Sequence, residues 1–169
     1  MIDCSSCRLC ETRTQVVPGF GDLDKPVMII GEAPGASEDV GGEPFIGRSG
    51  KLLFKLLGEQ GISREDCYIT NTVKCRPPKN RRPKPDEIAA CSTYLEQELN
   101  LSKSRVIITL GGTSTMAVLK RTGALQSLRG VSMGYGKRII STYHPAAALY
   151  NGKLVHELRS DLCLIDNNG

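Results

Sequence analysis

The chain has 169 residues, of which 40% are hydrophobic and 24% are charged, and its formal net charge is +4. These values suit one globular domain that can bury its own core without disulfides, so we expect a single domain over residues 1–169. No run approaches the about 20 apolar residues of a membrane span, and the first residues lack the basic and apolar regions of a secretory signal. We therefore expect a protein of the reducing cytoplasm that does not bind membranes.

The chain begins with three closely spaced cysteines, Cys4, Cys7 and Cys10. Two residues separate Cys4 from Cys7, so both sulfurs can reach one centre, and Cys75 and Cys91 form a second pair that joins a loop to a helix. Four thiolates in two such pairs suit a tetrahedral zinc ion or a [4Fe-4S] cluster, and the spacing does not separate these two. The alternative is that Cys91 is only a small buried hydrophobe. We favour a metal site, because Cys4 and Cys7 lie in a polar segment with no core face to fill.

Short β-branched runs alternate with helical patterns through the rest of the chain. Such apolar runs are typical of strands buried in a parallel sheet, and they lie at 25–31, 67–73, 105–111 and 137–143. Helical patterns occupy 49–61, 84–100, 112–123 and 152–166. The second of these helices carries one apolar face, made of Ile88, Cys91, Leu95 and Leu99. This order predicts an α/β fold with three layers, α/β/α, around a central four-stranded parallel sheet.

A strongly basic segment connects the second predicted strand to the second helix. It has no acidic residue, and its cations are Lys74, Arg76, Lys79, Arg81, Arg82 and Lys84. A solvated loop and a contact surface for a phosphate backbone both fit this pattern.

Candidate ligand-binding residues follow the predicted strands, because open α/β sheets bind ligands beyond the carboxyl ends of their strands. The turn at 31–39 is rich in glycine and proline, which brings backbone N–H groups close to a ligand, yet it lacks both common phosphate-binding motifs. His144 directly follows the last predicted strand and faces the same edge. Asn71 is a polar residue within an apolar strand, so its side chain must be hydrogen-bonded to the protein or to a ligand.

In their order along the chain, these motifs resemble the family 4 uracil-DNA glycosylases of bacteria and archaea. The resemblance covers the chain from Cys4 to Leu149 and depends on the two cysteine pairs and on the stretches 31–53, 68–91, 110–114, 128–130 and 143–149. It implies the uracil-DNA glycosylase fold and a DNA repair enzyme. Such an enzyme flips deoxyuridine out of DNA, hydrolyses the N-glycosidic bond and releases uracil, leaving an abasic site.

The resemblance also implies a cofactor and a DNA-binding surface. A structural [4Fe-4S] cluster would be held by Cys4, Cys7, Cys75 and Cys91, while Cys10 is not a ligand in the family pattern. The cluster would tie the amino-terminal segment to the basic segment and shape it for DNA. The DNA-binding residues would be Arg48, Ser49, Lys51, Arg76, Lys79, Arg81, Arg82 and Leu149. Leu149 or its neighbour Tyr150 would fill the gap left by the flipped base, unless residues 146–149 only begin a helix.

The resemblance assigns a role to each residue of the uracil site. Phe45 would stack on the base, Asn71 would accept from uracil N3–H and donate to O4, and Glu38 would exclude the methyl group of thymine. The catalytic residues would be His144, which donates to uracil O2, and Glu32, which orients water or braces the turn. The backbone of the turn formed by Gly31, Glu32 and Ala33 completes the site. Related glycosylases place an aspartate where this chain has Ala33, so that carboxylate is absent.

Two other functions stay open at this point. One is a non-catalytic, cluster-containing protein that binds nucleic acid with a vestigial pocket, which the intact Phe45, Asn71 and His144 argue against. The other is a zinc enzyme that acts on small nucleotides, which a brown protein with broad visible absorption would exclude. We expect the partner to be uracil-containing DNA, single- or double-stranded, and the protein to be a monomer.

Overall fold

The structure is a computed structural model and describes residues 1–165. The last four residues of the expected domain, among them Asp166 at the end of the last predicted helix, lie outside the described residues.

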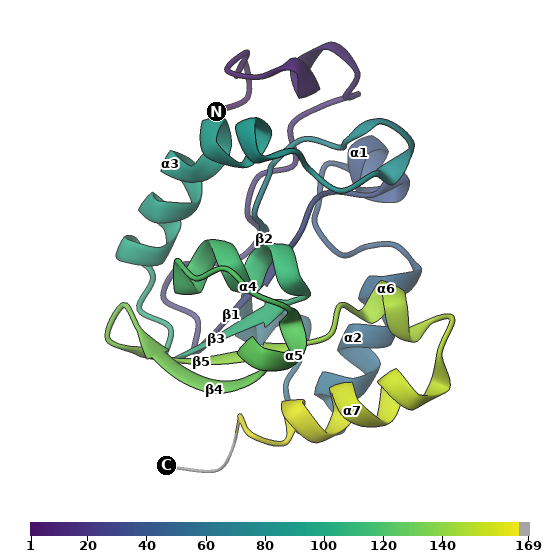
Figure 1. The fold of residues 1–169 in the computed structure, drawn as a ribbon, viewed down its shortest axis with the longest axis vertical. Coiled ribbons are helices and arrows are strands. Elements are labelled where there is room, and N and C mark those ends of the chain that lie inside the picture. Colours follow the sequence, from purple (N-terminus) through teal and green to yellow (C-terminus); the bar gives the residue numbers. More distant parts are fainter. Residues whose placement is uncertain (166–169) are drawn as a thin grey trace.

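A sheet with the strand order β2-β1-β3-β5-β4 forms the centre of the molecule (Figure 1). Its strands are β1 (Val27–Gly31), β2 (Cys67–Asn71), β3 (Val106–Leu110), β4 (Gly130–Gly134) and β5 (Lys137–Thr142). Strand β1 pairs in parallel with β2 and β3, and β3 pairs in parallel with β5. These four strands are the predicted parallel sheet. Every residue of β1, β2 and β3 is buried, which explains why they read as continuous apolar runs.

The fifth strand, β4, was not predicted, so the sheet is larger than the expected four-stranded one. It pairs antiparallel with β5, and the two are joined at Tyr135 and Gly136, whose φ angles of 53° and 68° are those of a tight hairpin turn. Strand β4 lies at the edge of the sheet, so none of its residues is fully buried, and Val131 and Met133 are exposed. A short strand of this kind lacks the apolar run that marks the buried strands.

Helices cover both faces of the sheet, which confirms the three-layer prediction. The α-helices are α1 (Ala36–Gly41), α2 (Arg48–Gly58), α3 (Pro85–Leu101), α4 (Gly112–Leu119), α5 (Leu125–Leu128), α6 (Pro145–Ala148) and α7 (Gly152–Leu162). Short 3₁₀ turns within residues 1–165 are η1 (Arg8–Glu11), η2 (Arg64–Asp66) and η3 (Pro78–Asn80). One core cluster packs α2, α6 and α7 against the sheet, and a second packs α3 and α4 against the opposite face.

Two details of the helices differ from the sequence-based expectation. Helix α4 ends at Leu119 rather than near residue 123, because Lys120 adopts a left-handed conformation with a φ of 54° that terminates the helix. Cys163 is the second: its place beside Leu162 and Ile165 on the last predicted helix suggests a core residue, but it is exposed at the carboxyl end of α7. Among residues 1–165, no helix combines the length and the apolar character that crossing a membrane requires.

The amino-terminal segment lies over the beginning of α3 and the loop that precedes it (Figure 1). A small third core cluster joins these parts of the chain and contains Leu9, Val16, Val73, Cys75 and Cys91. An ion pair between Arg8 and Asp86 fastens the segment to the first turn of α3.

Candidate active site

The carboxyl ends of the parallel strands surround a cavity of about 410 Å³. The cavity is lined by six of the seven predicted uracil-site residues, namely Glu32, Ala33, Glu38, Phe45, Asn71 and His144. The seventh, Gly31, lies where no side chain fits: a Cβ atom there would come within 2.3 Å of Asn71 Oδ1 and 2.6 Å of the Phe45 ring. The fold therefore gathers the predicted residues at one place.

Asn71, the last residue of β2, carries an unsatisfied polar atom. The residue is 2% exposed, and within residues 1–165 its Oδ1 is the only buried side-chain nitrogen or oxygen without a hydrogen-bond partner. Leaving a buried acceptor unpaired costs about 1–3 kcal/mol, so native proteins rarely do so without a reason. A donor on a bound ligand would satisfy this atom.

A buried ion pair holds the backbone of Asn71 in place. Lys74 is 1% exposed, and its Nζ donates to the Asn71 carbonyl oxygen at 2.8 Å and to Glu98 Oε2 at 2.6 Å. Thr70 accepts a further hydrogen bond from the same ammonium group, and Tyr68 donates to Glu98 Oε1 at 3.0 Å. Because the charges of Lys74 and Glu98 compensate each other, this buried network can hold the end of β2 rigid.

His144 follows β5 and caps the amino end of α6. Its Nδ1 accepts a hydrogen bond from the Ala146 N–H at 3.1 Å. The neutral ring therefore carries its proton on Nε2, which is left as a donor. Burial lowers the pKa of His144 and so favours the neutral ring, although Glu32 and Glu38 oppose the shift. A neutral imidazole donor of this kind suits an oxygen on which negative charge develops.

Phe45 forms the apolar wall of the cavity next to His144. The two ring centroids are 5.8 Å apart and the ring planes differ by 28°, so each ring restricts the orientation of the other.

Both cavity glutamates make contacts that connect loops. Glu38 accepts from the Gly47 N–H at 2.7 Å and from the Gly35 N–H at 3.1 Å, which joins the two ends of the segment containing Phe45. Glu32 Oε2 accepts from the Thr113 hydroxyl at 2.5 Å and lies 3.6 Å from Arg82 Nε. These are bracing contacts; the water-orienting role of Glu32 stays a prediction.

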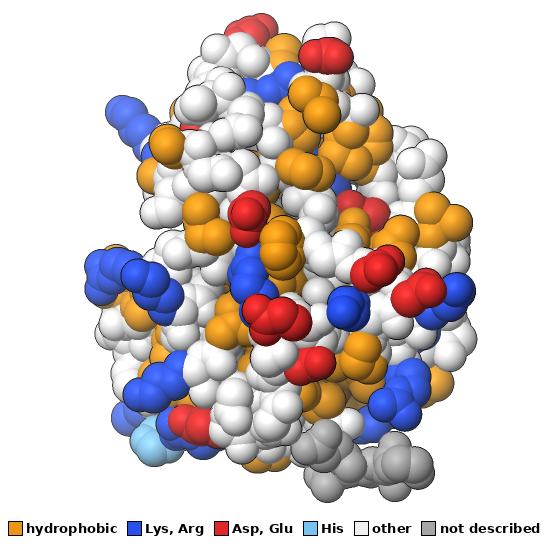
Figure 2. All heavy atoms as spheres, turned by 180° about the vertical axis from the view of Figure 1, so that it is seen from behind, with side chains coloured by type: hydrophobic (Ala, Val, Ile, Leu, Met, Phe, Trp, Pro, Cys, Tyr) orange, Lys and Arg blue, Asp and Glu red, His pale blue; other side chains and the backbone are white. Residues whose placement is uncertain are grey.

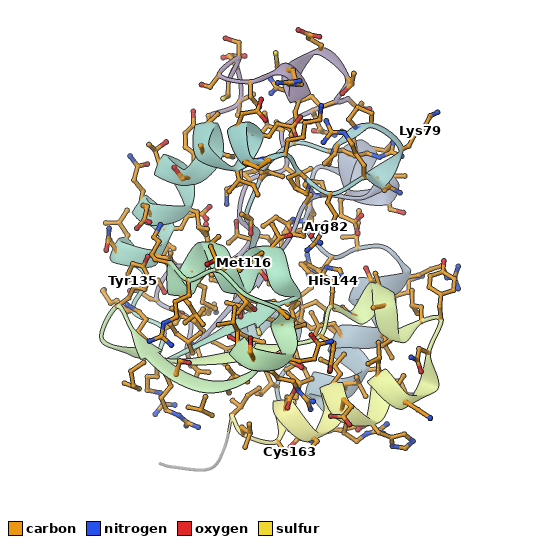
Figure 3. All side chains as sticks on the ribbon, in the orientation of Figure 1. Lys79, Arg82, Met116, Tyr135, His144 and Cys163 are labelled. Carbon is orange, nitrogen blue, oxygen red and sulfur yellow. The ribbon has the colours of Figure 1, made fainter. Side chains whose placement is uncertain are left out.

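The predicted DNA-binding residues fall into different environments. Arg81 lines the cavity, yet its guanidinium donates to both carboxylate oxygens of the fully buried Glu87, at 2.8 and 2.6 Å. Arg76 donates to Asn80 Oδ1 at 2.7 Å. The Arg82 side chain is 72% exposed and lies beside Glu32 and Thr113, whereas Lys79 points outward at the edge of the molecule (Figure 3).

The remaining predicted DNA contacts surround the cavity. Arg48 and Lys51 are exposed at the start of α2, with Ser49 between them on the cavity wall. Leu149 follows α6 and does not line the cavity, although Ala146 and Ala147 do. On the face that is turned away in Figure 1, basic and acidic side chains are mixed with apolar ones (Figure 2).

The four predicted cluster ligands lie together around a second cavity. Cys4, Cys7, Cys75 and Cys91 all line it, and Cys10 does not. All seven cysteines are free thiols. Within residues 1–165, no three potential ligand side chains are already arranged to bind a metal ion.

The donor chemistry around these thiols nevertheless suits a cluster. Arg13 donates to Cys75 Sγ at 3.1 Å, and the Lys74 N–H donates to Cys91 Sγ at 3.4 Å. Hydrogen bonds of this kind to ligand sulfurs are typical of iron–sulfur sites, where they compensate the charge of the cluster.

Sequence reasoning missed several residues that support the site. Glu87 and Glu98 lie on the buried face of α3 with Cys91 and Leu95, so their helical spacing within an apolar face was a signal. Thr113, which holds Glu32, lies in a glycine-rich stretch that was noted without a role for this residue. No motif or periodicity in the sequence around Arg64 indicates its contact with the Phe45 carbonyl oxygen.

Comparison of the amino-acid sequence with known proteins identifies its family. The model of the Uracil DNA glycosylase superfamily matches residues 18–162. A type-4 uracil-DNA glycosylase of Saccharolobus solfataricus is 46% identical over 168 residues, which cover 94% of this chain and 78% of that protein. The corresponding protein of Thermotoga maritima is 44% identical over 151 residues, covering 88% and 79% of the two chains. The chain therefore belongs to the uracil-DNA glycosylase superfamily and, within it, to the type-4 proteins.

Proposed function

We propose that this protein removes uracil from DNA by hydrolysing the N-glycosidic bond of deoxyuridine. The observation that carries the proposal is the unpaired, buried Oδ1 of Asn71 beside a cavity that also holds Phe45 and the Nε2 donor of His144. The type-4 relatives are named for the same reaction. The partner is uracil-containing DNA.

Recognition of the base follows from donor and acceptor chemistry. Uracil presents a donor at N3 and an acceptor at O4, and the Asn71 amide offers an acceptor and a donor in return. The corresponding edge of cytosine carries an acceptor and a donor, so it would leave both groups unpaired. Because a flipped amide would match cytosine instead, this selection requires that neighbouring groups lock the orientation of the amide; Lys74 holds the backbone that carries it.

Cleavage of the bond places negative charge on the leaving uracil. His144 would donate from Nε2 to uracil O2, and this hydrogen bond strengthens as the charge grows. Phe45 contributes stacking, which holds the base without selecting it. Glu32 would orient the attacking water while Thr113 and Arg82 hold its Oε2.

We further propose that Cys4, Cys7, Cys75 and Cys91 hold a [4Fe-4S] cluster. Their position around one cavity and the N–H donors to two of the sulfurs support this assignment. The cluster would have a structural role, because its bonds to the cysteines would link the amino-terminal segment to the start of the basic segment. We propose a location in the reducing cytoplasm, where thiols remain available to bind a cluster.

The DNA would lie across the mouth of the cavity. Exposed Arg48, Lys51, Lys79 and Arg82 would contact phosphates, while Ser49, Arg76 and Arg81 shape the surface between them. Arg81 contributes less charge than its neighbours, since Glu87 neutralises it. We propose that a monomer suffices, because all the uracil-site residues come from one chain.

A uracil-release assay tests the proposed function. Purified protein is incubated with oligonucleotides that carry one uracil in a U·G pair, in a U·A pair or in a single strand, and the free base is measured by mass spectrometry. We expect free uracil and an abasic site that alkali cleaves. Binding of uracil-containing DNA without any release would instead indicate the non-catalytic alternative.

A further inference from the structure

The segment that presents Phe45 to the cavity has an unfavourable backbone. Phe45 adopts a left-handed conformation with a φ of 56°, which is strained for a bulky residue and persists only where the surroundings enforce it. Glu38 fastens the ends of this segment at Gly35 and Gly47, but it does not bind Phe45 itself.

One guanidinium group contacts the segment at three consecutive residues. Arg64, in η2, donates from Nη2 to the Pro44 carbonyl oxygen at 2.8 Å and from Nη1 to the Phe45 carbonyl oxygen at 3.4 Å. The same Nη2 atom lies 3.5 Å from Glu43 Oε2. The flat, forked guanidinium suits this arrangement, because two carbonyl groups on adjacent residues need two donors at a fixed separation.

Arg64 is itself held in place by aromatic side chains. Its guanidinium carbon lies 4.5 Å from the centroid of the Phe20 ring and 5.3 Å from that of the Phe54 ring, and its side chain is only 21% exposed. Gly50 of α2 also lies against the Phe45 carbonyl group, since a Cβ atom there would come within 1.8 Å of the oxygen. Both α2 and Arg64 therefore contact this carbonyl group.

We propose that Arg64 is a positioning residue that sets the orientation of the Phe45 ring in the uracil site. Arg64 does not line the cavity, so any effect on the base passes through the segment it binds. The inference rests on the proposed function only in naming uracil as the base that Phe45 stacks on. Its structural part concerns the coupling between Arg64 and Phe45.

A double-mutant cycle tests this coupling. Arg64→Met keeps an unbranched apolar stem between the aromatic rings and removes both donors, and Phe45→Ala removes the ring. We expect Arg64→Met to slow single-turnover uracil release from U·G DNA by about ten- to a hundredfold, and to add little in the Phe45→Ala background. Arg159→Met, which removes an arginine paired with Glu59 on the surface, should not change the rate.

Further measurements separate the outcomes. Affinity for DNA that carries the non-cleavable 2′-fluoro-deoxyuridine is measured for the same variants and requires no turnover. We expect Arg64→Met to lower this affinity in the wild-type background and to change it little in the Phe45→Ala background. Arg64→Lys, which keeps the cation between the rings but offers one ammonium group, should behave like Arg64→Met and covers the case that the methionine variant does not fold. An unchanged rate, or an equal loss in both backgrounds, would overturn the proposal. Absence of release by the wild type would instead refute the proposed function.

Discussion

His144 combines two roles that require the same protonation state. Its Nδ1 accepts the Ala146 N–H as the cap of α6, and its Nε2 serves as the proposed donor to uracil O2. Both roles need the neutral ring, and burial lowers the pKa of His144 in that direction. His144 therefore stabilises the folded protein only at pH values at which its ring is neutral.

The first prediction follows from that lowered pKa. Above about pH 6.5 the ring is neutral in the folded and the unfolded chain, but below it the unfolded chain binds a proton that the folded chain resists. The free energy of unfolding should therefore fall faster for the wild type than for His144→Gln as the pH drops from about 6.5 toward the lower folded pKa. Urea unfolding at pH 8, 7, 6 and 5 measures this difference. Parallel pH curves for the two proteins would contradict it.

At the scale of elements, α3 carries acidic residues that tie the basic segment to the fold. Glu87 accepts both guanidinium donors of Arg81 and the Lys84 N–H at 2.7 Å, and Glu98 pairs with Lys74. The loop that we propose to contact DNA is thus anchored at both ends by buried carboxylates. Its exposed cations are held on a defined backbone, which matters for contacts to regularly spaced phosphates.

The second prediction concerns the Glu87 anchor. The hydrogen bonds from Arg81 lower the pKa of Glu87 to about 2, from an ordinary value of about 4.3. A lowered pKa contributes stability above about pH 4.3, and that contribution is lost as the pH falls toward about 2. The free energy of unfolding should be higher for the wild type than for Glu87→Gln at pH 7. The difference in this free energy between the two proteins should become smaller below about pH 4.3. Chemical denaturation at pH 7, 5, 4 and 3 tests this, with the exposed Glu65→Gln as the control.

The same elements show what the sequence could and could not predict. The four parallel strands and the residues at their carboxyl ends were predictable, because buried strands form apolar runs and the chain order fixes which ends meet. Strand β4 was not, since an exposed edge strand lacks that pattern. The Arg64 contact with Phe45 was also not predictable. It joins residues brought together only by the packing of η2 against α2, and no local periodicity reports such a contact.

At the scale of the whole molecule, the cysteine cavity joins parts of the chain that the sheet does not connect. Cys4 and Cys7 come from the amino-terminal segment, Cys75 from the loop after β2, and Cys91 from α3. A cofactor at this place would fix the amino-terminal segment relative to the DNA-facing loop.

The third prediction separates the ligand set from the other cysteines. The purified protein should be brown and contain about four iron atoms and four sulfides per chain. Cys75→Ser should lose them, whereas Cys10→Ser, which alters a cysteine outside the cavity, should retain them. Zinc in place of iron would support the zinc alternative, and loss of iron from Cys10→Ser alone would overturn the ligand assignment.

The fourth prediction concerns how the molecule accommodates duplex DNA. Leu149 follows α6 next to the cavity wall, and we propose that it fills the gap left by the flipped base, which offsets part of the few kcal/mol of unstacking. Leu149→Ala should then lose more activity on duplex than on single-stranded substrate, where little stacking is broken. Equal losses on both substrates would leave Leu149 with a purely structural role.

The central claim is that the side-chain amide of Asn71, whose buried Oδ1 is unpaired, selects uracil for excision. The most direct test compares uracil release from U·G DNA by the wild type, by Asn71→Asp and by the exposed control Asn100→Asp. A carboxylate cannot donate to uracil O4 and adds negative charge beside a base that becomes anionic, so we expect release by Asn71→Asp to fall by orders of magnitude. The control should match the wild type. Release by Asn71→Asp at a rate near that of the wild type would contradict the account.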